Sequence, residues 1–460
     1  MATSPRRPER HLLLWVVGAV LSTACRAEAT RPPEGIVVVC LDTLRADRTG
    51  VGGHPGGLTP NLDRLAAEGV YYDNAHAQAN ETVLSHASMF TGRYASELGP
   101  FSHQGIPEGT PTLAGRLHAA GWETGAVVAG GHMARAFGMH AGFQHYDDTL
   151  DWGSLADTGP PGLRWVDGLD PDRPFFLFVH GYDTHDRYLK PTPFGYSRAD
   201  ADHPGLGRDL GRVAGAVSQV ADGVWVGNTD QLERWATVRP RFERGRGAAE
   251  LPGARALTDA DVAHLSGLYD GSVAWADAAL GLFVGELEQR DLLDKVWLVV
   301  LSDHGHELGS EGSFHHRFAL TDETLQVPLV VRPPGGLETG RVETGLVDLL
   351  DVFPTLLSVG GAPSDASVRG QALWAGGVPR KPRRSTTFAE GRLRLLSARD
   401  TAGSRLTAEG LSADHPDLVS LLAETPVGGP SYRLTGSPDA ADDLQHAIVG
   451  WRTTLAEGAP

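Results

Sequence analysis

The sequence predicts an α/β fold, with a large, mostly parallel sheet flanked by helices and a small C-terminal α+β subdomain. Three observations predict it: short apolar runs rich in β-branched residues recur along the chain, helical patterns lie between them, and several runs end at acids or histidines. The first run, GIVVVCLD (35–42), is apolar until its final acid, which is typical of a strand buried on both faces.

Later strands are predicted from runs of the same character. Each is short, apolar and rich in Val, Leu or Phe, and each is followed by a change to polar residues or glycine. They are TGAVVA (124–129), PFFLFVHG (174–181), VWLVVLSD (296–303) and PLVVRP (328–333).

Helical patterns separate these strands. The segment TPNLDRLAAEG (59–69) has Thr59 as a predicted cap and Pro60 in its first turn. The segment PTLAGRLHAAG (111–121) has a similar pattern, and a long amphipathic stretch follows Thr258. Strands that alternate with helices in this way predict a domain built around a parallel sheet.

Composition and charge limit the class of partner. The chain has 460 residues, a net charge of −17 and an isoelectric point near 5.5. Because a general nucleic-acid binder needs a basic footprint, this balance argues against a nucleic acid as partner. It still allows a local anion site, since a bound metal ion inverts the local field.

The N-terminus predicts export. Basic residues precede the apolar core LLLWVVGAVL (12–21), and small residues follow it up to Cys25, so residues 1–25 are predicted to be a signal peptide. The core is too short for a membrane span, which needs about 20 residues. Lipoprotein-type cleavage would leave a lipid anchor on Cys25. The alternatives are a plain secretory signal cut near Ala27 or Ala29, and a twin-arginine signal. All predict an exported protein, either periplasmic or held on the cell envelope as a lipoprotein.

The rest of the chain divides by composition. Residues 26–34 are predicted to be a polar linker, and residues 35–374 the main domain. Residues 187–257 contain no strong strand pattern and many Gly, Pro and Asp, so we expect an insertion or lid there. Residues 375–460 are predicted to form the small subdomain.

Acids and histidines follow the predicted strands. Asp42 follows the first strand, and Asp303 and His304 follow the fourth. The third strand is followed by His180, Asp183 and His185. Because ligand sites of open α/β sheets lie at the carboxyl ends of the strands, these side chains are expected to meet at one edge. Two carboxylates and an imidazole suit a divalent metal ion, so Asp42, Asp303 and His304 are predicted ligands.

A hydroxyl precedes a predicted helix in NETVLSHASMFTGR (80–93). The helical run is expected to begin at Ser85, three residues after Thr82. A hydroxyl at a helix N-terminus meets unpaired N–H groups and the positive end of the dipole, which stabilise an alkoxide, and metal coordination stabilises it further. The alternative is that Thr82 or Ser85 only caps the helix.

Seven stretches carry a family's set of motifs in order. They are VVVCLDTLRAD (37–47), LTPNLDRLAAEGVYYDNAHAQ (58–78), SHASMFTGRY (85–94), FFLFVHGYDTH (175–185), LVVLSDHGHELGSEG (298–312), TDETLQVPLVVRPPG (321–335) and VDLLDVFPTLLSVGGAP (347–363). Together they resemble the sulfatase family of the alkaline-phosphatase superfamily. The resemblance implies a metal-dependent ester hydrolase or transferase. It also implies that the metal is held by the residues at positions Asp42, Thr82, Asp303 and His304.

The chain departs from the family at several of these positions. The family's Cys or Ser, which becomes formylglycine, is Thr82 here. Threonine cannot be oxidised to that aldehyde, because its carbinol carbon bears a methyl group. The family's second acid after the first strand is Thr43, and its Arg and Lys at two other motifs are His86 and His316. A Thr nucleophile with two Asp and one His resembles the phosphoryl-handling branches of the superfamily.

These departures lead to a mechanistic hypothesis. Thr82 attacks phosphorus, or alternatively sulfur, and forms a covalent threonyl intermediate. His185 acts as the acid for the leaving group or holds a non-bridging oxygen, and His316 and His86 hold the oxyanion. One divalent ion (Mg, Mn, Ca or Zn) activates the nucleophile and neutralises charge. A second ion held by His185, His316 and an acid such as Asp183 is an alternative.

The sequence therefore predicts an exported, metal-dependent hydrolase of an anionic sulfuric or phosphoric ester, with a phosphoester or phosphodiester favoured. The alternatives are a phospho-headgroup transferase and a metal-binding protein of the same fold with weak catalysis. Transferases of this superfamily are often tethered by several membrane helices, and this chain shows only a signal segment, which favours a hydrolase. No motif names the leaving group or an oligomeric state.

Overall fold

The computed structural model describes residues 34–98, 105–185, 259–308, 314–316, 320–337, 339–382, 384, 386–391, 395–402, 404–408, 432–435 and 443–448. These are called the described residues below. The predicted signal peptide (1–25) and insertion (187–257) lie outside them, as does the linker (26–34) except for Glu34. Those three assignments therefore stay predictions.

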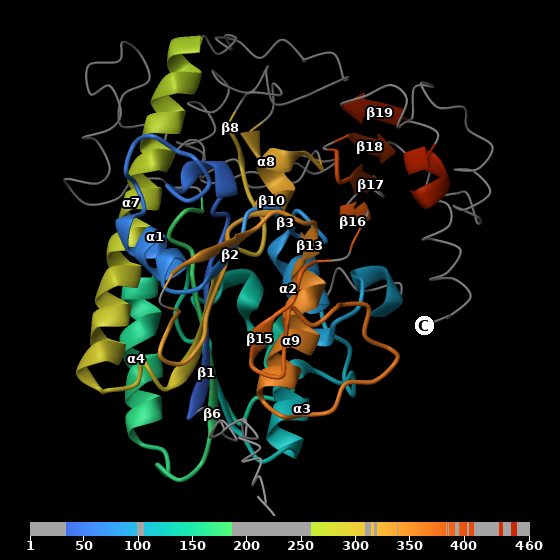
Figure 1. Cartoon of the computed structure of the whole chain (residues 1–460). Coiled ribbons are helices and arrows are strands. Elements are labelled where there is room, and N and C mark those ends of the chain that lie inside the picture. Colours follow the sequence, from blue (N-terminus) through green and yellow to red (C-terminus); the bar gives the residue numbers. More distant parts are fainter. Residues whose placement is uncertain are drawn as a thin grey trace, which may run out of the picture. The chain divides into compact units, whose positions relative to one another are not determined.

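The main sheet has eight strands within the described residues and is mostly parallel (Figure 1). Its centre is β1 (Gly35–Leu41), which pairs in parallel with β6 and with β7. Only the pairs made by β11 with β7 and with β2 are antiparallel. In spatial order the strands are β12 (Arg341–Glu343), β2 (Val70–Tyr72), β11 (Leu329–Arg332), β7 (Val296–Leu301), β1, β6 (Phe175–Gly181), β4 (Glu123–Val127) and β5 (His145–Asp147).

Helices cover both faces of this sheet (Figure 1). Alternate residues of β1 enter two different cores, because successive side chains of a strand point to opposite faces. One core is shared with α1 (Pro60–Ala67), α4 (Leu155–Asp167) and α7 (Asp259–Gln289), and the other with α2 (Thr82–Thr91), α3 (Leu113–Ala119) and α9 (Val352–Val359). The central strands β1, β6 and β7 are thus buried on both sides, as their continuous apolar sequences predict.

The predicted fold class is confirmed. The five predicted strands correspond to β1, β4, β6, β7 and β11, and the three predicted helices to α1, α3 and α7. One helix start differs from the prediction: α2 begins at Thr82 and not at Ser85. No helix among the described residues is long and apolar enough to cross a membrane.

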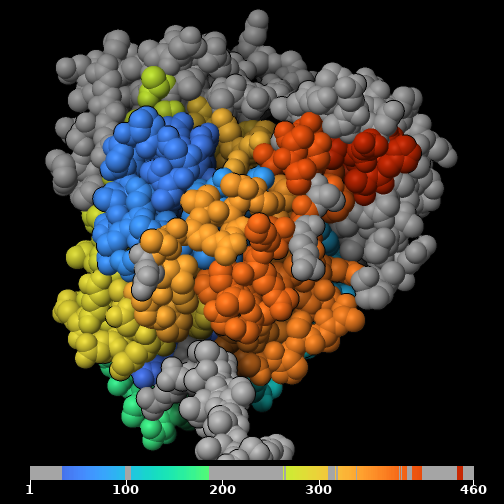
Figure 2. All heavy atoms as spheres, in the orientation of Figure 1, coloured from blue at the N-terminus to red at the C-terminus, as the bar shows by residue number. Residues whose placement is uncertain are grey.

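Smaller sheets complete the described part of the chain. Four antiparallel strands lie in the predicted C-terminal subdomain: β16 (Thr386–Gly391), β17 (Leu395–Asp400), β18 (Arg405–Ala408) and β19 (Tyr432–Thr435). The other short elements are β3 (Ala75–His76), β8 (Glu307–Leu308), β9 (Phe314–His315), α8 (Asp322–Leu325), β10 (Gln326–Val327), β13 (Val347–Asp348), β14 (Trp374–Ala375) and β15 (Val378–Pro379). In Figure 2 the early segments, in blue, lie against segments from beyond residue 320, in orange, as the pairing of β2 with β11 and β12 requires.

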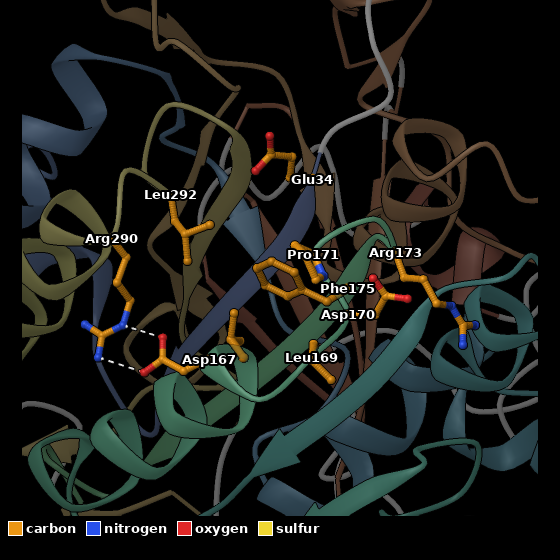
Figure 3. Close-up of a pocket in the computed structure, with 10 residues that line it drawn as sticks. Glu34, Asp167, Leu169, Asp170, Pro171, Arg173, Phe175, Arg290 and Leu292 are labelled. Carbon is orange, nitrogen blue, oxygen red and sulfur yellow. Dashed lines mark hydrogen bonds and ion pairs between the residues drawn. The ribbon is translucent and has the colours of Figure 1, made fainter.

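A hollow of about 280 Å³ opens at the amino ends of β1 and β6 (Figure 3). Glu34 and Phe175 line it at the strand starts, Asp167 lines it from the end of α4, and Arg290 lines it from the position just after α7. The Arg290 guanidinium is already held by Asp167, with N···O distances of 2.9 and 3.2 Å. Because ligand sites of such sheets lie at the opposite, carboxyl edge, this hollow is separate from the candidate active site.

Candidate active site

The carboxyl ends of β1, β6 and β7 bring the predicted ligands together. Asp42 directly follows β1, and its backbone N–H donates to the carbonyl of Gly181 at the end of β6 (3.0 Å). Asp303 lies two residues beyond the end of β7, and its Oδ1 accepts from the N–H of Thr43 (3.3 Å). Parallel pairing with aligned strand ends therefore places the two carboxylates side by side, although 260 residues separate Asp303 from Thr43.

The predicted metal ligands form one compact group. Asp42, Asp303 and His304 are all buried, and one ligand atom from each lies within 4.8 Å of the other two. Asp42 Oδ1 has no hydrogen-bond partner among the described residues, as is also true of Asp303 Oδ2. A buried carboxylate oxygen without a donor is costly. A divalent cation would satisfy both oxygens, so the donor set fits a metal ion.

The pKa shifts of the two acids also favour a bound cation. Burial, and next the charge of Asp303, raise the pKa of Asp42 to about 8. Burial also opposes the ionisation of Asp303, but nearby imidazoles, first that of His304, outweigh it and lower the pKa of this carboxyl. Without a cation, one acid of the pair therefore holds a proton near neutral pH. A bound cation would allow both to ionise.

The Thr82 hydroxyl lies within this group. Oγ1 donates to Asp42 Oδ2 at 3.2 Å and is 3.4 Å from His304 Nε2. Glu81 occupies the N-cap position of α2 and makes no side-chain cap. The Ser85 hydroxyl donates to the carbonyl oxygen of Asp303 at 2.6 Å. The capping alternative is therefore wrong for both hydroxyls, and the Thr82 oxygen lies at the start of a helix and faces the acids.

His86 is buried behind the candidate site, between the backbone of Thr82, the carboxylate of Asp303 and the thiol of Cys40. Its Nδ1 is 2.9 Å from the carbonyl oxygen of Thr82 and 3.5 Å from Asp303 Oδ2, and its Nε2 is 3.6 Å from Cys40 Sγ. The ring is fully buried and packs edge-on against Phe90 and Phe178. Because both nitrogens already contact protein atoms, this position does not suit the predicted oxyanion contact. The placement fits a residue that orients Thr82 and Asp303.

The other two predicted histidines lie next to the metal group. The His316 ring lies 4.4 Å from that of His304, centroid to centroid, and 5.4 Å from that of His185. His316 Nδ1 is 2.8 Å from the carbonyl oxygen of Asn80, two residues before Thr82. The structure thus brings His185 and His316 to the same place, although it does not test their roles.

The second-metal alternative gains no support from the geometry. Asp183 Oδ2 accepts a hydrogen bond from the N–H of Leu155 at the start of α4 (2.7 Å). Among the described residues, the groups close enough to share an ion are Asp42–Asp303–His304 and Cys40–His86–His180, and His185 and His316 belong to neither.

Sequence reasoning places His180 at the end of the third predicted strand but gives it no role, and the structure shows that it contacts the site from β6. Its Nε2 is 3.3 Å from Asp42 Oδ2. The available signal is strand register: His180 pairs with Cys40 across β1 and β6, so its side chain lies on the face shared by Cys40 and Asp42. Burial lowers the pKa of His180 to about 4, so the ring is neutral near pH 7. It therefore contacts Asp42 as a neutral imidazole.

Comparisons with known proteins point to one family. A sequence profile of the Sulfatase family matches residues 35–362. The arylsulfatase of Clostridium perfringens is 24% identical over 400 residues, which cover 74% of this chain and 77% of that protein. The N-acetylglucosamine-6-O-sulfatase of Bacteroides thetaiotaomicron is 22% identical over 416 residues, covering 78% and 74%. The solved phosphonate monoester hydrolase of Agrobacterium radiobacter aligns with a TM-score of 0.64 at 18% identity over 93% of this chain and 95% of that one, and so shares its fold.

Proposed function

This chain belongs to the sulfatase family, and from that premise we propose that it hydrolyses a phosphate ester, with a diester favoured, through the Thr82 hydroxyl as nucleophile. That it is a sulfatase-like hydrolase of ester bonds follows from its relatives. The identity of the nucleophile and the preference for phosphorus are the proposal.

One observation carries the assignment of Thr82. Its hydroxyl makes no helix cap, and its contacts are Asp42 Oδ2 at 3.2 Å and His304 Nε2 at 3.4 Å. A threonine that served only the helix would direct its oxygen to the free N–H groups of the first turn. This one is directed at two predicted metal ligands, which is where a nucleophile must lie to be activated.

The residues then have the following roles. The Thr82 oxygen attacks phosphorus as its proton passes to Asp42 Oδ2, the acceptor within reach. The bond from phosphorus to the leaving oxygen breaks, and His185 gives that oxygen a proton. Water then attacks phosphorus, loses a proton to His185, and releases Thr82, which regains its own proton from Asp42. His316 contacts the non-bridging oxygens.

The metal ligands have a supporting role. Asp42, Asp303, His304 and Thr82 would hold a divalent ion, whose positive charge would lower the pKa of the hydroxyl and neutralise the oxyanion. His86 holds the carbonyl of Thr82 and lies against Asp303, so it fixes two of these residues relative to each other.

The substitution at Thr82 supports phosphorus over sulfur, and those at His86 and His316 support a substrate with little negative charge. Thr82 cannot become formylglycine, so the covalent adduct is an ordinary ester, and water must cleave it by attack at the central atom. The family's Arg and Lys are replaced by His86 and His316, and both imidazoles are buried. Imidazoles supply less fixed positive charge than Arg or Lys, which suits an ester with a single negative charge, such as a phosphodiester, over a phosphate monoester with two.

We also propose that the enzyme acts outside the cytoplasm, with Cys25 as the site of a lipid anchor. The basic start, apolar core and terminal Cys of residues 1–25 support this. Labelling of the expressed full chain with radioactive palmitate should give a signal that Cys25→Ser removes. An unlabelled wild-type chain would favour a plain secretory signal.

A substrate panel with two Thr82 variants tests the function. Aryl sulfate, phosphate mono- and diesters and phosphonate esters are assayed with Mg, Mn, Ca and Zn in turn. We expect the diester to turn over, Thr82→Ala to lose at least about 10³-fold in kcat, and Thr82→Ser to retain measurable activity. Thr91→Ala is the matched control, because Thr91 lies in the same helix and its hydroxyl donates to the Ala87 carbonyl of that helix (2.7 Å).

The outcomes are distinct. Wild-type activity in Thr82→Ala rejects the nucleophile. Turnover of the sulfate alone rejects the preference for phosphorus and leaves the hydrolase assignment intact.

A further inference from the structure

Trp152 is a large apolar side chain left partly in solvent next to the candidate site. It lies in the loop between β5 and α4, and 43% of its surface is exposed. The proposed mechanism gives it no role. Its ring nevertheless lies 5.3 Å from that of His185, the proposed acid, centroid to centroid.

The backbone of Trp152 is in an unfavourable conformation. Its φ is +58°, in the left-handed region that bulky residues rarely adopt. The non-glycine residues with positive φ among the described residues are Thr43, Trp152 and Asp291. Thr43 directly follows the predicted metal ligand Asp42. Two of these three strained residues therefore border the candidate site, and strain of this kind gathers where function requires a fixed position.

Neighbouring residues hold the strained conformation in place. The N–H of Gly153 donates to the carbonyl of Ala129 (3.2 Å), and the carbonyl of Gly153 accepts from the N–H of Tyr182 (2.9 Å). Ser154 then opens α4 with a capping box, in which its backbone N–H donates to Asp157 Oδ2 (2.8 Å). With the following residues pinned to two strand ends and a helix, the loop fixes where the indole points.

The indole belongs to an aromatic group that leads to the acid. Trp152 packs on Tyr182 with ring centroids 4.6 Å apart, and meets the ring of His132 edge-on at 5.8 Å. The Tyr182 hydroxyl accepts from the N–H of His132 (3.0 Å), which ties this group together. The His185 ring contacts both Trp152 and Tyr182 and is itself only 5% exposed. The exposed part of the indole therefore provides an apolar wall next to a buried acid.

We propose that Trp152 forms one wall of the leaving-group subsite and favours esters whose leaving group is a ring with a flat apolar face. This rests on the proposed function, because the group next to His185 is the leaving group only if His185 protonates it. An aromatic wall selects for ring faces by stacking. An aryl ring and the apolar face of a sugar ring share this chemistry.

Variants of Trp152 compared across leaving groups test the proposal. The metal-loaded full chain is assayed with three esters of one acid that differ only in the leaving group, which is phenyl, a pyranose or ethyl. For Trp152→Leu we expect kcat/KM to fall by about 3- to 10-fold on the phenyl ester, the pyranose ester or both, and to change less than about 2-fold on the ethyl ester. Trp152→Phe, which restores a ring, should recover most of the loss.

A second tryptophan provides the control. Trp165 in α4 stacks on His145 with centroids 5.8 Å apart. Trp165→Leu loses a similar aromatic contact at a different place, so any change in its activity should be the same on all three esters.

The pattern of activity loss across the three esters shows which leaving group Trp152 contacts. Loss on the phenyl ester alone assigns the wall to aryl groups, and loss on the pyranose ester alone assigns it to sugars. An equal loss on all three esters, or no loss on any, overturns the proposal. If the wild-type chain turns over none of the three, the proposed function has failed. The wall is then tested by calorimetry with phenylphosphonate and ethylphosphonate, where loss of a phenyl preference in Trp152→Leu supports it and an unchanged preference overturns it.

Discussion

Replacing Asp42 by Asn should make the metal-free protein more stable, although it removes a predicted metal ligand. Asp42 and Asp303 are both buried, and burial raises the pKa of Asp42 from 3.8 to about 8. The folded protein therefore binds this proton more tightly than the unfolded chain does. Below about pH 4 both the folded and the unfolded state hold the proton, so the free energy of unfolding is not reduced. As the pH rises from about 4 towards 8, only the unfolded chain releases it, so the free energy of unfolding falls.

The size of the effect follows from that shift. At pH 7 the gap between the pH and the unfolded pKa is about 3 units, and at 1.36 kcal/mol per unit the cost to the folded state is roughly 4 kcal/mol. Asparagine has nearly the same shape and carries no charge, so Asp42→Asn avoids this cost. In a chelator the variant should exceed the wild type by up to about 4 kcal/mol at pH 7 and by almost nothing at pH 4.

Bound metal should reduce the difference in the free energy of unfolding between Asp42→Asn and the wild type. An ion that binds only the folded wild type at a hundred times its Kd adds about 2.7 kcal/mol, and Asp42→Asn should gain much less. The measurement is urea unfolding followed by tryptophan fluorescence at several pH values, with chelator or with excess metal. Asp63→Asn is the control: Asp63 Oδ1 accepts from the Val51 N–H and the Thr59 hydroxyl, both at 3.0 Å, so its loss should cost the same with and without metal. A variant no more stable than the wild type in chelator at pH 7 would refute the reasoning.

Two further predictions concern contacts that support the site and the fold. His180→Leu should weaken metal binding by about 10- to 100-fold in a chelator competition, because Asp42 loses the imidazole 3.3 Å from its Oδ2, and His180→Gln should restore most of the affinity. Unchanged affinity in the Leu variant would show that His180 does not orient the ligand. Asp277→Ala should lower the free energy of unfolding by about 2 kcal/mol, because this α7 carboxylate accepts from the N–H groups of Asn61 (3.1 Å) and Leu62 (2.9 Å) at the start of α1. An unchanged urea midpoint would contradict it.

The start of α1 shows where a local prediction fails. Thr59 has the sequence signature of an N-cap, and Pro60 does occupy the first turn. The Thr59 hydroxyl, however, donates to Asp63, and Asp277 accepts from the first N–H groups of the helix. A capping preference describes what a residue does with its immediate neighbours. It cannot anticipate a carboxylate that arrives from another helix more than 200 residues later.

The difference between local sequence and tertiary contacts also explains the two histidines, His86 and His316. His86 and His316 both stand where the family has a cation, so sequence treats them alike. The fold places His316 beside His304 and buries His86 between Cys40 and the backbone of Thr82. Which nitrogens contact protein atoms depends on packing around α2, and no motif encodes that packing.

By itself, the sequence determined the α/β class, the family and the edge of the sheet where the chemistry lies. Those follow from periodicity and from the residues at strand ends, and both are local properties repeated along the chain. Only the tertiary structure decided that Thr82 faces Asp42 and does not cap its helix, that His180 contacts Asp42 from the neighbouring strand, and that the strained Trp152 lies beside His185. Each of these depends on how separate segments pack against one another, because a side chain's partner is chosen by the whole fold.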